Sequence, residues 1–371
     1  MKVLVIGAGG REDALAWKLA GSARVKKVFI APGNAGTARH GENVALKAGD
    51  IEGLKGFALK ERIDLTVVGP EVPLTLGIVD EFERAGLRIF GPSRLASEIE
   101  GSKAFSKDLM ARHNIPTARY MKFADPREAR ARVEAMRPPF VVKADGLAAG
   151  KGVVICTAKD EALEAIEAIM VKKAFGPSGA RIVIEEFLEG EEASFLAITD
   201  GKTVIPLAPA QDHKAIYDGD RGPNTGGMGT YSPAPLITPE LEHEVMEKVM
   251  KPAVAAMEAE GRPYKGALYA GLMIGAGGLK VLEFNCRFGD PETQPIMMRL
   301  EDDLFDVLQA AVDGRLDGVS LNWSKKHAAC VVMAAGGYPG DYAKGSVISG
   351  LDAAAGMEDV MVFHAGTAFM D

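Results

Sequence analysis

Short apolar runs, each ending in a glycine- or proline-rich loop, dominate the first hundred residues. The runs, with the first loop residue after each, are 2–6 with Gly7, 28–31 with Pro32, 65–68 with Gly69, and 88–90 with Gly91. Helical stretches separate the runs, the first over 11–20. Strands that alternate with helices in this way predict a doubly wound parallel sheet. Its ligands are expected beyond the carboxyl ends of the strands, where these loops lie.

The first loop, Gly7-Ala-Gly9, resembles the start of a dinucleotide-binding fingerprint. However, Glu12 stands at the third glycine position, where close packing of helix on strand needs a small residue. The second run ends in Phe29-Ile-Ala-Pro32, without the acidic residue that would hold a ribose. The loop is therefore expected to bind a phosphate through its amides and the helix N-terminus, and not a nicotinamide cofactor.

Composition limits the class of protein. A chain of 371 residues with 47% hydrophobic and 25% charged residues predicts a globular protein of two or three domains. The net charge of −8 argues against a general binder of nucleic acid or anionic membranes. Cys156, Cys286 and Cys330 are expected as small core residues in a reducing compartment. With no apolar run of about 18 residues and no signal-peptide pattern, we expect a cytoplasmic protein, acting as a monomer.

From about residue 101 the pattern changes to strands in hairpins, followed by helices. Strands are expected over 140–144, 152–156, 181–186, 193–199 and 203–208, and helices over 160–170, 240–257 and 303–312. The segment 211–235 has no periodicity and is rich in Gly, Pro, Asn and Asp, which is typical of a functional lid or of a disordered segment. A strand over 327–334 and a Gly-rich tail indicate a small final domain.

The segment Glu283-Phe-Asn-Cys-Arg-Phe-Gly-Asp-Pro-Glu-Thr-Gln294 carries the strongest chemical signal. It follows an apolar strand, so side chains should alternate, with 283, 285 and 287 on one face and 284, 286 and 288 in the core. The oxygens of Glu283 and Asn285 suit Mg²⁺, which also takes waters and nucleotide phosphates. Arg287 could neutralise a transferring phosphoryl group. The alternative is a surface ion pair before a turn.

Two further segments indicate a nucleotide site. The loop 146–152 lies between two strands, and its glycine amides could approach phosphates, with Lys143 as a point charge. The alternative is a turn with solvated lysines. The strand that ends at 185–188 could offer backbone groups to an adenine edge, and Glu192 could accept from ribose hydroxyls. The alternative there is a solvated acidic turn, but a position between a phosphate loop and a metal-binding strand favours the nucleotide.

These features together resemble the ATP-grasp fold, and the chain resembles the family of phosphoribosylamine–glycine ligases. The ATP-grasp features are Lys103, Lys143, the loop 146–152, the stretch 185–192 and Glu283-x-Asn285. The family motifs are Gly7-x-Gly-Gly-Arg-Glu12, Ala31-Pro-Gly-Asn-Ala-Gly36, Gly69-Pro-Glu-x-Pro-Leu74, Glu100-Gly-Ser-Lys103, Gln211-Asp-His-Lys214, Pro223-Asn-Thr-Gly-Gly-Met228, Arg287-Phe-Gly-Asp-Pro-Glu292 and His364-Ala-Gly-Thr367. The resemblance covers essentially the whole chain.

The resemblance implies an N-terminal Rossmann-like (pre-ATP-grasp) substrate domain over 1–101, an ATP-grasp α+β core over 102–322 with a mobile subdomain at about 118–190, and a small C-terminal domain over 323–371. It implies an ADP-forming carbon–nitrogen ligase of de novo purine synthesis. Glycine would be joined to 5-phosphoribosylamine through glycyl phosphate, with ATP as substrate and Mg²⁺ or Mn²⁺ bound. The alternatives are another ATP-grasp ligase or carboxylase of purine synthesis, and a nucleotide-sensing module without turnover.

The resemblance also implies the site residues. Those expected to bind ATP are Lys103, Lys143, Gly146, Gly150, Lys151, Gly152, Glu185, Glu186, Leu188 and Glu192. Glu283 and Asn285 would bind metal, and Lys143 and Arg287 would act in catalysis. Those expected to bind the other substrates are Gly9, Gly10, Gly69, Pro70, Glu71, Asp212, Lys214, Asn224, Thr225, Gly226, Gly227, Met228, Arg287, Asp290 and Glu292.

The chain departs from the family pattern at two places. Asp13 stands where the first loop of the family commonly has His. Relatives also continue some tens of residues beyond the His364-Ala-Gly-Thr367 stretch, through a Gly-Gly-Arg turn, so we expect a shortened final domain.

Overall fold

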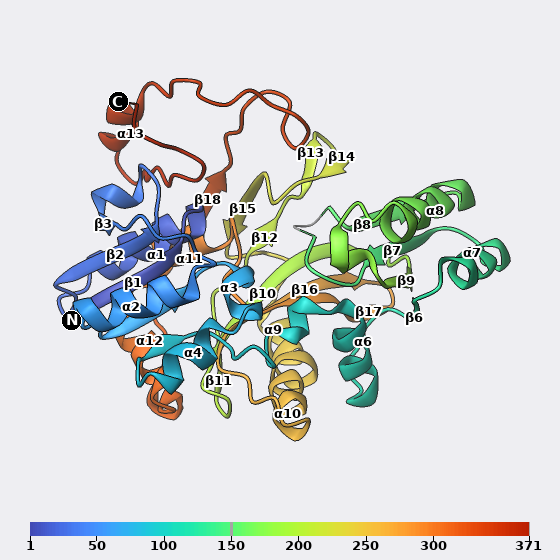
Figure 1. Ribbon diagram of the computed structural model, residues 1–371, viewed down its shortest axis with the longest axis horizontal. Coiled ribbons are helices and arrows are strands. Elements are labelled where there is room, and N and C mark those ends of the chain that lie inside the picture. Colours follow the sequence, from blue (N-terminus) through green and yellow to red (C-terminus); the bar gives the residue numbers. More distant parts are fainter. Residues whose placement is uncertain (149–150, 371) are drawn as a thin grey trace.

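The computed structural model describes residues 1–148 and 151–370 (Figure 1). Its N-terminal part is a parallel sheet in the order β3-β2-β1-β4-β5, as predicted. The strands are β1 (Lys2–Gly7), β2 (Lys27–Pro32), β3 (Glu42–Asn43), β4 (Leu65–Val68) and β5 (Ile89–Phe90), and the helices are α1 (Gly10–Ala20), α2 (Ile51–Glu61), α3 (Glu71–Thr75) and α4 (Ile78–Arg84). The strand order reverses between β1 and β4, so the loops after these strands share the crevice where such sheets bind ligands.

A second, antiparallel sheet has the order β6-β9-β7-β8 and carries two helices. It consists of β6 (Tyr120–Phe123), α7 (Pro126–Ala135), β7 (Phe140–Ala144), β8 (Val153–Cys156), α8 (Lys159–Ile166) and β9 (Ile182–Glu186). A π-helical turn continues α8 through Val171. In Figure 1 this subdomain (green) projects away from the N-terminal sheet.

The central sheet, in the order β11-β10-β16-β17, is also antiparallel. It consists of β10 (Glu191–Thr199), β11 (Val204–Pro206), β16 (Gly266–Gly275) and β17 (Gly278–Asn285). Beside it lie α5 (Glu98–Gly101), α6 (Lys103–Arg112), α9 (Pro239–Val245) and α10 (Lys251–Ala259) (Figure 1). The helix α11 (Thr293–Arg299) packs on α1, and α12 (Leu304–Val312) packs on β5 and α1. Within the described ranges, no helix is long and apolar enough to cross a membrane.

The segment 211–235 is more ordered than its sequence suggests, and the expectation of a segment without regular structure was wrong. It contains β12 (Gln211–Asp212), β13 (Ala215–Tyr217), β14 (Arg221–Asn224) and β15 (Gly229–Ser232). β13 and β14 form a hairpin, whereas β15 pairs with both β12 and β18 (Ala328–Val331). The partner strand β18 lies about a hundred residues after β15 in the chain, so no local sequence pattern predicts the pairing.

The C-terminal segment returns to the N-terminal sheet. In Figure 1 it leaves β18, arches past the β13–β14 hairpin and carries α13 (Leu351–Ala355) back toward β2 and β3. Asn34 Nδ2 donates to the carbonyl of His364 at 2.8 Å and to that of Ala8 at 2.9 Å. Trp17 of α1 meets Phe363 edge to face at 5.7 Å. Residues near the two ends of the chain therefore lie side by side at the N-terminal sheet.

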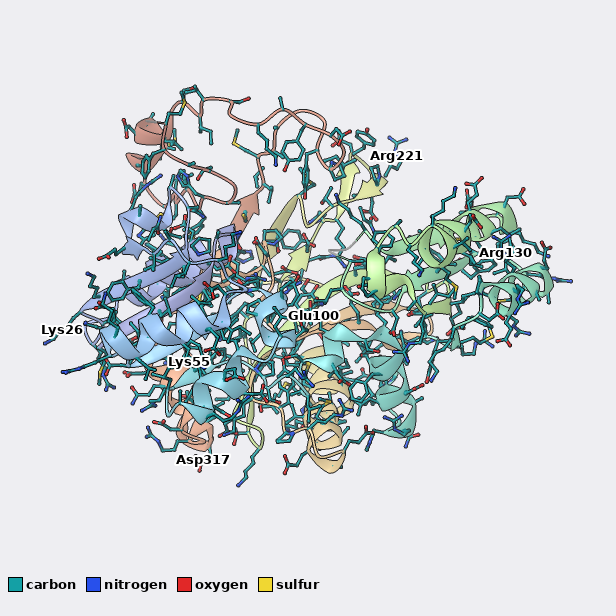
Figure 2. The ribbon with its side chains drawn as sticks, viewed as in Figure 1. Lys26, Lys55, Glu100, Arg130, Arg221 and Asp317 are labelled. Carbon is teal, nitrogen blue, oxygen red and sulfur yellow. The ribbon has the colours of Figure 1, made fainter. Side chains whose placement is uncertain are left out.

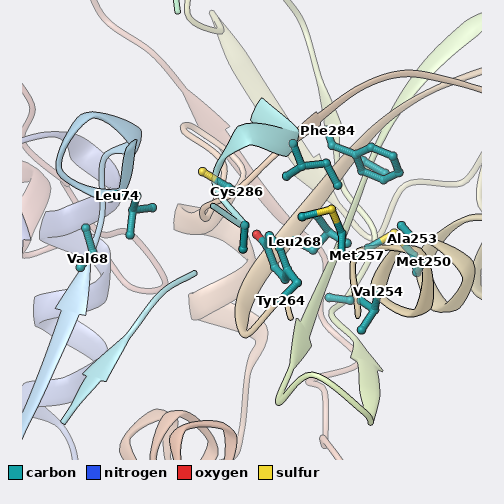
Figure 3. Close-up of a cluster of buried hydrophobic side chains, with 14 of the residues drawn as sticks. Val68, Leu74, Met250, Ala253, Val254, Met257, Tyr264, Leu268, Phe284 and Cys286 are labelled. Atoms are coloured by element: carbon teal, nitrogen blue, oxygen red, sulfur yellow. The ribbon is translucent and has the colours of Figure 1, made fainter. Parts of the chain in front are cut away.

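One hydrophobic core joins the N-terminal sheet to the central sheet. Figure 3 shows Val68 and Leu74 in the same cluster as Leu268, Phe284 and Cys286. Cys156 is buried like Cys286, but Cys330 on β18 is only half-buried, so it is not the core residue that we predicted. Since the core is continuous, the N-terminal loops and the strand β17 are held in fixed positions relative to each other.

Candidate active site

A β-bulge on β17 aims the candidate metal ligands. Gly271 pairs with Glu283 and Leu272 pairs with Val281, so Leu282 is an extra residue in the ladder. Val281 and Phe284 are both buried although they are three residues apart. The bulge thus shifts the alternation by one residue, and 284, 286 and 288 are buried as predicted.

Glu283 lies at the focus of four cations. Burial alone would raise the pKa of its carboxyl, but Lys214, Lys103, Lys143 and Arg287 outweigh burial and lower the pKa to about 2. Glu283 is therefore ionised at neutral pH, and the surrounding positive charge exceeds its own. Such a place suits a polyphosphate.

The oxygens of Glu283 and Asn285 fit a divalent metal ion that also binds phosphates. Asn285 Oδ1 accepts from Arg287 Nη2 at 3.1 Å, which orients the amide. In the described parts of the chain, no three His, Cys, Asp or Glu side chains gather as a metal-binding cluster. A pair of protein oxygens is what Mg²⁺ commonly uses when nucleotide phosphates and water complete its shell.

Lys143 belongs to a buried charge cluster. Its ammonium lies 3.1 Å from Glu185 Oε2 and donates to the carbonyl of the bulged Leu282 at 3.3 Å. Lys107 reaches the same carboxylate oxygen at 2.9 Å. The second oxygen, Glu185 Oε1, is buried and has no hydrogen-bond partner among the described residues. This oxygen is free for a ligand donor.

The base of the loop 146–152 is fixed to the start of α6. Asp145 accepts from Ser102 Oγ at 3.0 Å, from the Ala104 amide at 2.7 Å and from Arg181 Nε at 2.9 Å. Lys103 Nζ donates to the carbonyl of Gly146 at 3.4 Å. Of the other predicted loop residues, Lys151 is exposed, Gly152 is buried and Gly150 lies outside the described residues.

At the end of β9 the acidic residues are held by ion pairs. Glu186 pairs with Arg119 Nε at 2.7 Å and Lys280 Nζ at 2.9 Å. Burial opposes ionisation of Glu186, but hydrogen bonds from both partners lower its pKa to about 2. Glu192 pairs with Lys214 at 3.0 Å, and Leu188 is half-buried. The side chain of Glu186 is therefore already engaged, and so is its amide, which donates to the carbonyl of Arg119 at 2.9 Å.

Two neighbouring carboxyl groups, those of Asp212 and Glu292, form a second cluster. Burial and the charge of Glu292 raise the pKa of Asp212 to about 8. Glu292 accepts from Ser194 Oγ at 2.8 Å, and Ser194 lies 3.1 Å from Tyr269 OH. Asp212 Oδ1 is buried and has no partner among the described residues. The cluster suits an ammonium group.

The residues 224–228 are divided between the hairpin and the site. Thr225 Oγ1 donates to the carbonyl of Lys214 and accepts from the amide of Gly227, which closes the β13–β14 hairpin. Gly227 has φ +126°, and a Cβ there would lie 2.7 Å from Asp212 Oδ1. Asn224 and Gly226 are exposed and Met228 is half-buried. Only Gly227 of this group touches the acidic cluster.

At the carboxyl edge of the N-terminal sheet, Glu12 fills the space that the glycines leave. Its carboxylate accepts from the Gly9 amide and from Arg11 Nε, each at 2.5 Å. A Cβ on Gly69 would lie 2.0 Å from Glu12 Oε1, and a Cβ on Gly10 would lie 2.7 Å from the side-chain nitrogen Nε2 of Gln294. The Gly9 amide is thus already used within the fold, where we had expected it to be free for a phosphate.

Arg287 joins the two halves of the site. Its guanidinium lies 3.3 Å from Glu71 and 3.5 Å from Glu100, and Glu100 also accepts from the Cys286 amide at 2.7 Å. Figure 2 shows Glu100 near the middle of the molecule. Asp290 accepts from the Arg11 amide at 3.3 Å. Arg287 and Asp290 therefore link the motif after β17 to the N-terminal loops. Gly69 is buried there and Pro70 half-buried.

Asp13, the departure noted in the sequence, holds the returning C-terminal segment. Its Oδ2 accepts from the His364 amide at 2.7 Å, and its Oδ1 lies 3.5 Å from His40 Nε2. Arg39 contacts the ring of His364. Burial raises the pKa of Asp13 to about 6, against the effects of the His364 amide and Arg39.

Sequence reasoning missed five polar residues of the site: Lys107, Asp145, Glu100, Ser194 and Tyr269. A signal existed for Lys107, because it follows Lys103 by one helical turn and so shares its face. Glu100 stands in the motif Glu100-Gly-Ser-Lys103, although no role was predicted for it. For Asp145, Ser194 and Tyr269, only the fold brings the partners together.

Comparison with known proteins covers the whole length of the chain. Residues 1–100, 101–293 and 328–371 match the N domain, the ATP-grasp (A) domain and the C domain of phosphoribosylglycinamide synthetase. The phosphoribosylamine–glycine ligase of Allochromatium vinosum is 58% identical over 99% of this chain and 86% of its own length. The crystal structure of the phosphoribosylamine–glycine ligase of Thermotoga maritima matches this chain with a TM-score of 0.84 at 33% identity. The match covers 100% of this chain and 88% of the Thermotoga maritima chain. The biotin carboxylase domain of the Hydrogenobacter thermophilus 2-oxoglutarate carboxylase, solved with MgADP and bicarbonate, shares the fold at a TM-score of 0.70 and 20% identity, over 88% of this chain and 73% of its own.

Proposed function

This chain belongs to the phosphoribosylglycinamide synthetase family, and from that premise we propose how its residues divide the work. The chain is an ADP-forming carbon–nitrogen ligase that joins glycine to 5-phosphoribosylamine in purine biosynthesis. ATP and a divalent metal ion take part in the reaction. The observation that supports our assignment of roles is the focus of four cations on Glu283.

The nucleotide would lie between the small antiparallel sheet and β17. We assign the phosphates to Lys103, Lys143 and the loop 146–152, the adenine edge to 185–188, and the ribose to Glu192. Glu283 and Asn285 would hold the metal ion, which when bound neutralises phosphate charge; Mg²⁺ is our first candidate because both donors are hard oxygens. A glycine carboxylate oxygen would attack the γ-phosphorus, releasing ADP and forming glycyl phosphate.

Glycine would lie with its ammonium group on Asp212 and Glu292. Burial and Glu292 raise the pKa of Asp212 to about 8, and an ammonium group beside both carboxyl groups would stabilise their ionised forms. The carboxylate of the amino acid could then point toward Glu283, since Lys214 lies near both groups. No protein nucleophile is required, because both substrates contain their own.

Phosphoribosylamine would bind over the N-terminal loops, near Gly10 and Glu71. Its nitrogen would attack the carbonyl carbon of glycyl phosphate, the bond to the phosphate oxygen would break, and the nitrogen would lose a proton. Arg287, held by Glu71 and Glu100, lies between these loops and Asn285. It is placed to stabilise the departing phosphate.

We further propose that 1–101 carries the phosphoribosylamine site and 102–322 the ATP and glycine sites, with 118–190 moving on nucleotide binding and 323–371 covering the N-terminal loops. The free thiols of Cys156, Cys286 and Cys330 suit a reducing compartment, in keeping with a cytoplasmic enzyme. We expect a monomer.

The experiment is ADP release measured with each substrate omitted in turn. We expect release that requires glycine and increases when phosphoribosylamine is present. Release driven by bicarbonate or formate instead would identify another ligase or carboxylase. ATP binding without release under any condition would identify a nucleotide sensor.

A further inference from the structure

A buried cation that the reaction scheme leaves without a role lies beside the nucleotide site. Lys107 on α6 is 2% exposed, and its ammonium donates to Thr117 Oγ1 at 2.8 Å. Thr117 donates in turn to the carbonyl of Val281, on the strand that carries Glu283. Burying an ammonium costs several kcal/mol unless partners compensate. The partner that carries charge here is Glu185, at 2.9 Å.

Glu185 has two cationic partners, although one would neutralise it. Lys107 and Lys143 approach the same oxygen, Oε2, and both side chains are almost completely buried. The three groups together carry a net charge of +1. Lys143 lies near the end of β7, the strand that leads directly into the loop 146–152, whereas Lys107 lies on α6 and is also held by Thr117. One cation can therefore leave Glu185 while the other stays.

We propose that Lys107 is a positioning residue that keeps Glu185 neutralised, so that the ammonium of Lys143 can move from Glu185 to the phosphates of a nucleoside triphosphate. The inference rests on the proposed function, because it takes Lys143 as a phosphate ligand. Without Lys107, each movement of Lys143 would leave a buried carboxylate without a counterion. The cost would fall on nucleotide binding and not on the chemical step.

The surroundings of Lys107 give the proposal a pH signature. The charged side chains that act on Lys107 come from β7 (Lys143), β9 (Glu185) and β17 (Glu283). Lys103 lies one turn earlier on α6. Burial lowers the pKa of Lys107 to about 8, and the charge of Glu185 opposes this effect. The Lys107 proton is thus lost at mildly alkaline pH, where Lys143 should become the only counterion of Glu185.

The first test compares three variants by the KM for ATP, with glycine and phosphoribosylamine saturating. For Lys107→Met we expect a KM about 10–100-fold higher, with kcat within about threefold of the unmodified enzyme. Lys107→Arg keeps the charge and should keep KM within about fivefold, without an alkaline rise. Lys122→Met, which removes an exposed lysine paired with Asp108, is the matched control and should change neither constant.

The second test repeats Lys107→Met in a Glu185→Gln background. If Lys107 acts by neutralising Glu185, removing the carboxylate charge should remove the need for it. The additional rise in KM should then shrink to less than about threefold. An equal rise in both backgrounds would mean that Lys107 serves only packing, and the proposal would fail.

The unmodified enzyme provides a check that does not depend on how the variants fold. Its KM for ATP should rise between pH 7 and pH 9, and this rise should be absent in Glu185→Gln. A flat profile in the unmodified enzyme would overturn the proposal. Glycine-dependent ADP release in the same assay separates the outcomes: if it is missing, the proposed function fails, and if it is present with a flat profile, only the role of Lys107 fails.

Discussion

Two regions of the molecule differ in how their charged side chains are arranged. One is the set of strands around the nucleotide site, and the other is the set of loops at the carboxyl edge of the N-terminal sheet. Four cations converge on Glu283, and three of them also pair with other carboxylates. At the N-terminal edge, Glu12 is matched by Arg11 and by the Gly9 amide. We assign the first region to a polyphosphate and its metal ion, whereas the second holds its own loops in place. The convergence of cations on one carboxylate is thus the feature on which our placement of the most highly charged ligand rests.

The largest expected effect is on catalysis, in the nucleotide region. Glu283→Gln removes a metal ligand charge, and kcat for ADP release should fall about 10²–10³-fold. Glu189→Gln, on the exposed turn after β9, is the control and should change kcat little. Near-normal turnover of Glu283→Gln at saturating Mg²⁺ would refute the metal assignment.

The next effect is on stability, in the N-terminal region. Glu12→Gln places an amide against two buried donors and breaks the pair with Arg11, so the free energy of unfolding should fall by about 2–4 kcal/mol. Urea denaturation measures this change. Glu52→Gln, which removes an exposed ion pair with Lys55, should cost less than about 0.5 kcal/mol. Equal losses in the two variants would show that Glu12 is not an internal anchor.

Asp13 offers a further test at the N-terminal edge, because burial raises the pKa of its carboxyl to about 6. The native state therefore holds a proton that the unfolded chain has lost, and stability falls as pH rises from about 4 to about 6. Asp13→Asn should raise the free energy of unfolding by about 1–3 kcal/mol at pH 8 and by almost nothing at pH 4. A gain of the same size at both pH values would argue against titration of Asp13.

The smallest effect is a change in local opening. β14 (Arg221–Asn224) is exposed along its length, and Figure 2 shows Arg221 on this outer hairpin. Its amides should exchange rapidly with solvent in the free enzyme and more slowly once ATP and glycine are bound. Hydrogen exchange followed by mass spectrometry checks this, with the amides of β1 as a slowly exchanging reference. Equal exchange of the hairpin with and without ligands would exclude a lid.

The sequence was most informative where a pattern is local. The strand–loop repeat predicted the parallel sheet, and the alternation after Glu283 predicted which side chains are buried. It was least informative where partners lie far apart in the chain. Asp13 and His364 are separated by 351 residues, and nothing in either motif predicts their hydrogen bond. The bulge at Leu282 is a property of the β16–β17 pairing and has no signature in β17 alone.

The residues of the candidate site also differ in how far the sequence could predict them. Lys143, Glu283 and Asn285 could be proposed from residue type and strand position. The hydrogen bond from the Gly9 amide to Glu12 could not, because it depends on a carboxylate that occupies the space left by Gly7 and Gly69. Lys107 could not be assigned a role either, since its function depends on sharing Glu185 with Lys143.

The central claim is that glycine is activated in the nucleotide region and transferred at the N-terminal loops. The most direct test traps glycyl phosphate with hydroxylamine, without phosphoribosylamine, and compares it with product formation in Glu283→Gln and Glu71→Gln. We predict that Glu283→Gln loses both signals. Glu71→Gln should keep the trapped product within about threefold while ligation falls at least about tenfold. If Glu71→Gln lost trapping and ligation in equal measure, the separation of activation from transfer would be contradicted.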